Sequence, residues 1–150
     1  MNLNALSKMI AEKKYFFKQL QLKLGDSGSI ELQGEKETYL FDYQLGSSGM
    51  LAIYVASIFD SKQKYQTRYK TYPLIRVDVN GPPHMCEDGD LWENHIHIFT
   101  GSLNKSEMHT YKLEDYNPSL FQDLSGWNIL YDFFKCCNIS TDNVYLQEII

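Results

Sequence analysis

All four histidines of this 150-residue chain fall between residues 84 and 109. His95 and His97 stand in a short stretch, 94–99, that alternates polar and apolar side chains. Successive side chains of a β-strand point to opposite faces of the sheet, so both imidazoles are expected to project from one face. Two imidazoles on one face are a starting point for a metal site or for an acid–base pair.

A second strand, predicted at 74–79, can complete this group. Its apolar residues alternate with Arg76 and Asp78, and a Gly-Pro-Pro segment ends it. If it pairs with the histidine strand as a hairpin around the loop at 80–93, Arg76 and Asp78 share the face of both histidines. His84 then lies at the base of the loop. The sequence therefore predicts a cluster of two or three imidazoles, one carboxylate and one guanidinium.

Three kinds of function suit such a cluster. A transition metal needs three or four nitrogen or oxygen donors at about 2.0–2.2 Å, and His95 and His97 together with His84 or Asp78 can supply them. General acid–base cleavage of a phosphodiester can use His95 and His97 as base and acid, with Arg76 stabilising the transition-state charge. The third is a polar recognition face without chemistry.

A structural explanation of the strand histidines stays open beside these three. An alternating strand with a solvated face must carry polar side chains, and histidine is tolerated there. One enzyme class is not supported, because the two-histidine phosphoesterases need a hydroxyl residue two places after each histidine. In this chain His97 and Phe99 occupy those two places.

The pattern of the whole chain predicts an α+β fold, with residues 1–150 as a single domain. Apolar residues spaced by three and four predict an amphipathic helix at 3–20. A second amphipathic helix is predicted after Ser125, which can cap it, with Asn138 as its C-terminal stop. Between the helices the period changes to two. Strands are predicted at 39–45, 51–59, 62–70, 74–79, 94–99 and 109–113, and a last one at 144–150.

Short strands joined by turn-like connections favour an antiparallel meander over βαβ units. We therefore expect one curved antiparallel sheet of five to seven short strands, with an amphipathic helix at each end of the sequence.

Two charged stretches are candidate partner-binding surfaces. A basic face follows the strand at 62–70 and carries Lys62, Lys64, Arg68 and Lys70. It suits a nucleic-acid backbone or an acidic partner, or it belongs to a charged edge strand that resists aggregation. An acidic loop carries Glu87, Asp88, Asp90 and Glu93. It suits a cation or a basic partner, or it is an ordinary solvated loop, since it lacks the ligand spacing of a calcium hand.

Composition excludes several classes of protein. Aromatic residues make up 14% of the chain. They supply enough large apolar surface for a hydrophobic core, which argues against disorder. The net charge is −5 and only two basic residues are arginine, so general nucleic-acid or anionic-membrane binding is disfavoured. Three cysteines, an odd number, make a poor disulfide framework. With no signal peptide or apolar span in the sequence, we expect a soluble cytoplasmic protein.

The residues of the histidine segment also carry a resemblance to a known family. The pattern Arg-x-Asp-x-x-Gly-Pro-Pro-His begins at Arg76 and ends at His84; Asp88-Gly89 and the run His-Ile-His-Ile-Phe from His95 follow it. The whole resembles a small family of uncharacterised proteins found in phages, prophages and other mobile elements of low-GC bacteria. The resemblance covers about the C-terminal half of the chain and brings no established activity.

What the resemblance implies is a setting in a bacterial host cell. Small acidic phage-borne proteins without an enzyme signature often bind host defence machinery, including CRISPR effectors. The leading prediction is therefore stoichiometric binding of a host protein or nucleoprotein complex, as an inhibitor of a defence nuclease. The alternative is a metal- or histidine-dependent phosphodiesterase or nuclease, with a divalent transition metal as the one cofactor considered. The third is an accessory protein whose basic face at 62–70 contacts nucleic acid; its binding should weaken steeply with salt.

Overall fold

A seven-stranded sheet dominates the computed structural model, which describes residues 4–46, 62–124 and 127–146. Its strands lie in the order β1-β3-β4-β5-β6-β9-β10, and every neighbouring pair is antiparallel. The predicted antiparallel sheet is thus confirmed. The strands are β1 (Tyr15–Phe16), β3 (Ser27–Gln33), β4 (Thr38–Gln44), β5 (Gln63–Tyr69), β6 (Tyr72–Val79), β9 (His95–Ser102) and β10 (Lys105–Lys112).

Two small strand pairs accompany the main sheet. β2 (Leu20–Leu22) pairs in parallel with β11 (Val144–Leu146), and so joins the two ends of the described chain. β7 (His84–Met85) pairs with β8 (Leu91–Trp92) as an antiparallel hairpin. This β7–β8 hairpin lies inside the segment predicted as a loop at 80–93, which therefore has regular structure of its own.

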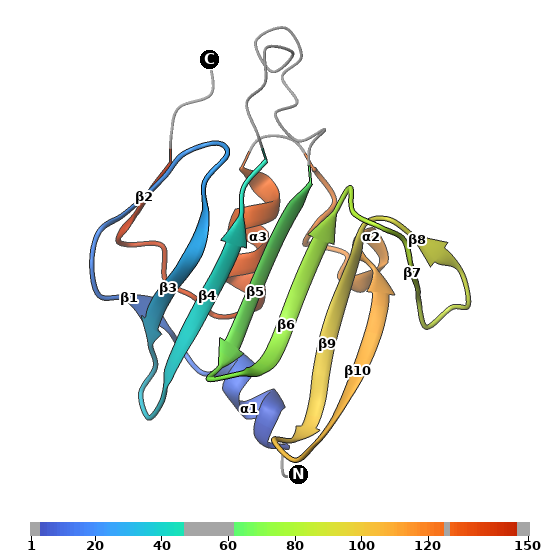
Figure 1. The fold of residues 1–150 in the computed structure, drawn as a ribbon, viewed down its shortest axis with the longest axis horizontal. Helices are drawn as coiled ribbons and strands as arrows, with labels where there is room; N and C mark the ends of the chain where they lie inside the picture. The colour runs from blue at the N-terminus through green and yellow to red at the C-terminus, as the bar shows by residue number, and fades with distance from the viewer. Residues whose placement is uncertain (1–3, 47–61, 125–126, 147–150) are drawn as a thin grey trace, which may run out of the picture.

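The helices α1 (Ala5–Ala11), α2 (Leu113–Tyr116) and α3 (Asn128–Cys136) complete the fold. In Figure 1, α1 and α3 lie behind the sheet, while no helix covers the face turned toward the viewer. Aromatic rings hold α3 on its face: Phe41 lies 5.9 Å from Phe133 and 5.3 Å from Phe134 between ring centroids. The core therefore fills one side of the sheet, and the other side is a helix-free face.

The predicted N-terminal helix at 3–20 is wrong in its length. α1 ends at Ala11, and the chain continues into β1 and β2. From residue 15 the burial alternates, with Phe16 and Leu22 buried and their neighbours exposed, which is the period of a strand. Lys14 helps to end the helix, because its ammonium donates hydrogen bonds to the carbonyls of Ile10 and Glu12.

The second predicted helix is confirmed as α3, and its C-terminal stop is where the sequence placed it. Asn138 adopts a left-handed backbone with φ of 55°, the conformation that commonly ends a helix. The predicted cap Ser125 and the predicted strand at 51–59 lie outside the described residues. Of the last predicted strand, at 144–150, β11 confirms residues 144–146, and the rest lies outside the described residues.

β5, the strand with the basic face, is a central strand. It lies between β4 and β6, and the edges of the main sheet are β1 and β10. The explanation of its lysines as protection of a sheet edge is therefore wrong. Separately, no helix of the described residues is long and apolar enough to cross a membrane.

Candidate metal centre

The pairing of β6 with β9 brings the predicted cluster together. Arg76 stands opposite His97 and Asp78 opposite His95 in the antiparallel register. Directly opposed residues of two paired strands point to the same face, so these four side chains share the helix-free face. The predicted pairing of the two strands is confirmed, although their connection contains the β7–β8 hairpin.

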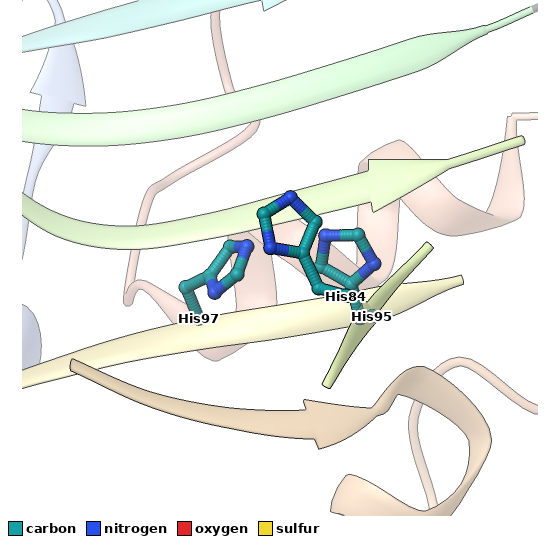
Figure 2. A group of neighbouring side chains, drawn as sticks. All are labelled: His84, His95 and His97. Atoms are coloured by element: carbon teal, nitrogen blue, oxygen red, sulfur yellow. The ribbon is translucent and has the colours of Figure 1, made fainter. Parts of the chain in front are cut away.

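The β7–β8 hairpin adds His84 to the two strand histidines. The ring centroids lie 4.6 Å apart for His95 and His97, and 4.7 Å and 5.1 Å from His84 to these two. Figure 2 shows the three rings gathered over the face of the sheet at β6 and β9, with His84 coming from the neighbouring hairpin. One ring nitrogen of each lies within 4.8 Å of those of the others, a separation that could hold a metal ion.

Asp78 supplies an oxygen at the same place. Its Oδ2 lies 3.1 Å from Nε2 of His95 and 3.5 Å from Nε2 of His97. Ligand atoms of a tetrahedral site with bonds of about 2.0–2.1 Å are about 3.3 Å apart, so these separations are those of a ligand set. Nε of Arg76 donates to the same oxygen at 2.8 Å and fixes the carboxylate.

Hydrogen bonds from the outer ring nitrogens orient both strand histidines. Nδ1 of His95 lies 3.3 Å from the Trp92 carbonyl, and Nδ1 of His97 lies 2.8 Å from the Thr110 hydroxyl. A carbonyl can only accept, so in this contact Nδ1 of His95 carries the hydrogen. Metal-binding histidines are oriented by such partners.

The inner atoms of the cluster are buried and lie against one another. His95, His97 and Asp78 are 1%, 0% and 3% exposed, whereas His84 is exposed. Within the described residues, the polar partner of Nε2 in both buried histidines is Oδ2 of Asp78, at 3.1 Å and 3.5 Å, and Oδ1 of Asp78 forms no hydrogen bond. Buried polar atoms are nearly always satisfied, so this compact group of imidazole nitrogens and carboxylate oxygens is either an internal hydrogen-bonded cluster or a candidate site for a cation.

The charge states fit the same conclusion. Burial raises the pKa of the Asp78 carboxyl, but its bonds to His95, His97 and Arg76 lower it by more, so it stays well below its usual range. Burial lowers the pKa of His97, and the positive charge of Arg76 adds to this effect. The carboxylate is thus ionised and the His97 imidazole neutral at pH 7, and these are the forms that bind metals.

The fourth histidine, His109, and most of the acidic loop form ion pairs outside the histidine cluster. His109 lies 3.1 Å from Glu87. Lys112 on β10 binds Asp88 at 3.1 Å and Asp90 at 3.0 Å. Glu93 is exposed next to Trp92, where both line a cavity of about 520 Å³. The acidic loop is therefore largely paired with β10.

The basic face is paired in part. Arg68 binds Asp42 at 2.6 Å through its Nε, and its Nη1 donates to the carbonyl of Lys70 in the turn after β5. Lys62 and Lys64 are exposed, and Lys64 stands opposite Asp78 in the register of β5 and β6. This face therefore adjoins the metal centre.

Two parts of the site were not predicted from the sequence. Thr110 orients His97 because β10 places it directly opposite that residue, and the Trp92 carbonyl reaches His95 because 80–93 folds as a hairpin. Thr110 could have been found only from the register of β9 and β10.

Comparison with known protein families assigns the chain to a family. The model of DUF6978, which is described as a family of unknown function, matches residues 1–139. The chain belongs to DUF6978. No curated protein and no solved structure matches it.

Membership of DUF6978 confirms the coarser part of the resemblance seen in the sequence, which is an uncharacterised family. It assigns no activity, and the origin in phages or other mobile elements stays a prediction. The argument about function therefore depends on the histidine site itself.

Proposed function

We propose that the protein is a transition-metal-dependent phosphodiesterase. The observation that carries this proposal is the convergence of four donor groups. One nitrogen of each of His84, His95 and His97 lies within 4.8 Å of the others, and an Asp78 oxygen lies 3.1 Å and 3.5 Å from two of them. Imidazole and carboxylate donors suit zinc and neighbouring first-row metals.

The four ligands differ in how firmly the fold holds them. Asp78, His95 and His97 come from two paired strands and are buried, so their positions are set by the sheet. His84 comes from the short β7–β8 hairpin and is exposed. The fourth ligand thus faces the solvent, on the side from which a substrate arrives.

The site has the parts that phosphodiester hydrolysis needs. A zinc ion held by His84, His95, His97 and Asp78 would have to accept water as a fifth ligand on its solvent side, and it would then lower the pKa of that water to about 7 and supply hydroxide. Arg76 donates to Asp78 and its side chain is 33% exposed, so the guanidinium is also available to negative oxygens of a phosphoryl group. Fixed positive charge at that position stabilises the transition state.

The competing prediction was stoichiometric binding of a host defence nuclease through charged surfaces. Three of the four acidic-loop carboxylates pair with β10, so little of the acidic charge is free for a partner, whereas on the basic face Arg68 pairs with Asp42 and Lys62 and Lys64 are exposed. Exposed ion pairs of this kind exchange with solvent at small cost, so the binding role stays a prediction. The convergence of imidazole and carboxylate donors in the histidine cluster favours the enzyme.

Loss of His84 tests the enzyme proposal without disturbing the core, because this residue is exposed. For the zinc-loaded protein, we expect His84→Ala to lower kcat/KM for bis(p-nitrophenyl) phosphate by about 100-fold, since a ligand of the ion is lost. His109→Ala is the matched control. It removes a histidine outside the cluster and should change the rate by less than about twofold.

Equal rates for wild type and His84→Ala, at equal zinc content, would show that the cluster does not catalyse the reaction. If the folded, zinc-loaded wild type shows no hydrolysis, the phosphodiesterase proposal is wrong and stoichiometric binding is favoured instead.

A further inference from the structure

A polar hollow of about 310 Å³ lies on the helix-free face beside the metal centre. Its described lining comes from β3, β4, β5 and β6 and includes Asp42, Lys64, Gln66 and Arg76. Arg76 also donates to Asp78, so the hollow and the metal centre share a side chain. A group bound in the hollow therefore lies next to the proposed metal ligands.

The charges around the hollow favour an anion. Asp42, the acidic residue of the described lining, is bound by Arg68 at 2.6 Å and by Gln66 at 3.0 Å. Burial raises the pKa of Asp42, but these bonds lower it by more, so its charge is present and already matched by Arg68. Lys64 is exposed and forms no ion pair within the described ranges. Lys64 thus gives the hollow an unpaired positive charge, and Arg76, which is paired with Asp78 through Nε, adds a guanidinium that is partly exposed.

Positive side chains continue beyond the hollow along β5. Lys62, Lys64 and Arg68 alternate with buried residues and so project to the helix-free face. Neighbours on one face of a strand are about 6.6 Å apart, similar to the spacing of phosphates along an extended nucleic-acid strand. Because His95 and His97 are buried beside the β7–β8 hairpin, a flexible single strand reaches them more easily than a rigid duplex.

We propose that the helix-free face binds single-stranded nucleic acid, with one phosphate in the polar hollow and the adjacent phosphodiester at the metal centre. This inference rests on the proposed phosphodiesterase activity and adds its substrate class. Lys64 and Arg76 contact the phosphate in the hollow, and Lys62 contacts the next one along β5. With a net charge of −5 on the chain, attraction comes from this local group alone, so binding depends steeply on salt.

The experiment compares two substrates for the zinc-loaded full chain: a short single-stranded RNA or DNA, and bis(p-nitrophenyl) phosphate. Lys64→Ala should lower kcat/KM for the oligonucleotide about tenfold more than for the small diester, mainly through KM. It should also reduce the salt dependence of oligonucleotide binding by about one phosphate contact. Lys135→Ala removes an exposed lysine from α3, behind the sheet, and should leave both substrates unaffected.

The outcomes separate this inference from the function on which it rests. If Lys64→Ala affects both substrates equally, or if a duplex binds as tightly as a single strand, the inference is wrong and the phosphodiesterase proposal stands. If wild type hydrolyses the small diester but does not bind oligonucleotides, the inference is wrong in the same way. Absence of small-diester hydrolysis by wild type overturns the proposed function, and this inference with it.

Discussion

Zinc is expected to raise the thermal stability of the wild-type protein and to have no such effect on a His97→Ala variant. The donors come from β6, β7 and β9, so they form a site only in the folded chain. A ligand that binds only the folded state stabilises it by about 2.7 kcal/mol at 100 times its Kd. For a chain of this size the shift in Tm is roughly 5–10 °C, measurable by calorimetry with and without zinc.

The comparison must use the zinc-dependent shift, because removing the buried His97 ring lowers stability by itself. Asp78→Asn keeps the volume of the side chain and should also reduce the shift. His109→Ala should retain the whole shift. An equal shift in wild type and His97→Ala would show that zinc binds elsewhere.

Replacing Lys14 by methionine is expected to lower the free energy of unfolding by about 3 kcal/mol. The ammonium of Lys14 is buried and donates to the carbonyls of Ile10, Glu12 and Cys137 at 2.8–2.9 Å. Methionine fills the space of the stem but leaves three carbonyls without this donor, each costing about 1 kcal/mol. Lys13→Met, at an exposed position, should change stability by less than about 0.5 kcal/mol in the same denaturant titration.

The effect of Lys14 also depends on pH. Burial lowers the pKa of Lys14 to about 8, whereas in the unfolded chain it is about 10.4. Between these values the unfolded chain binds more protons than the native protein, so the contribution of Lys14 to stability rises with pH. The gap between wild type and Lys14→Met should widen by up to about 1.4 kcal/mol per unit from pH 8 to 10. A constant gap would mean that folding does not perturb this pKa.

The clustering of the histidines with Arg76 and Asp78 could be predicted from the sequence because its main parts follow from strand alternation. The spacing of His95 and His97, and of Arg76 and Asp78, fixes the face of each pair once the two strands are adjacent. A single pairing of β6 with β9 then brings the four together. The position of His84 followed from its place just after β6.

The N-terminal segment could not be predicted because two periods overlap in it. Leu3 to Leu20 fits a helical stripe, yet residues after Ala11 pair with distant strands that a local pattern does not reveal. β1 pairs with β3, and β2 with β11 from the other end of the chain. Burial of Lys14 depends on the end of α3 as well. Such tertiary contacts override local propensity.

For the two charged stretches, too, the local sequence does not reveal the tertiary contacts. The alternation of β5 identified its basic face, but its central place in the sheet depends on the order of the strands. The acidic loop was visible as composition, whereas its pairing with Lys112 and His109 depends on the hairpin that folds it toward β10.

The ligand set of the bound ion tests the central claim most directly. X-ray absorption at the zinc edge of the stoichiometrically loaded protein should show three imidazole nitrogens and the Asp78 oxygen at about 2.0–2.1 Å together with a water oxygen, and one imidazole fewer in His84→Ala. Binding of less than one ion per chain, or a shell of oxygen atoms without imidazole, would contradict a metal centre formed by His84, His95, His97 and Asp78.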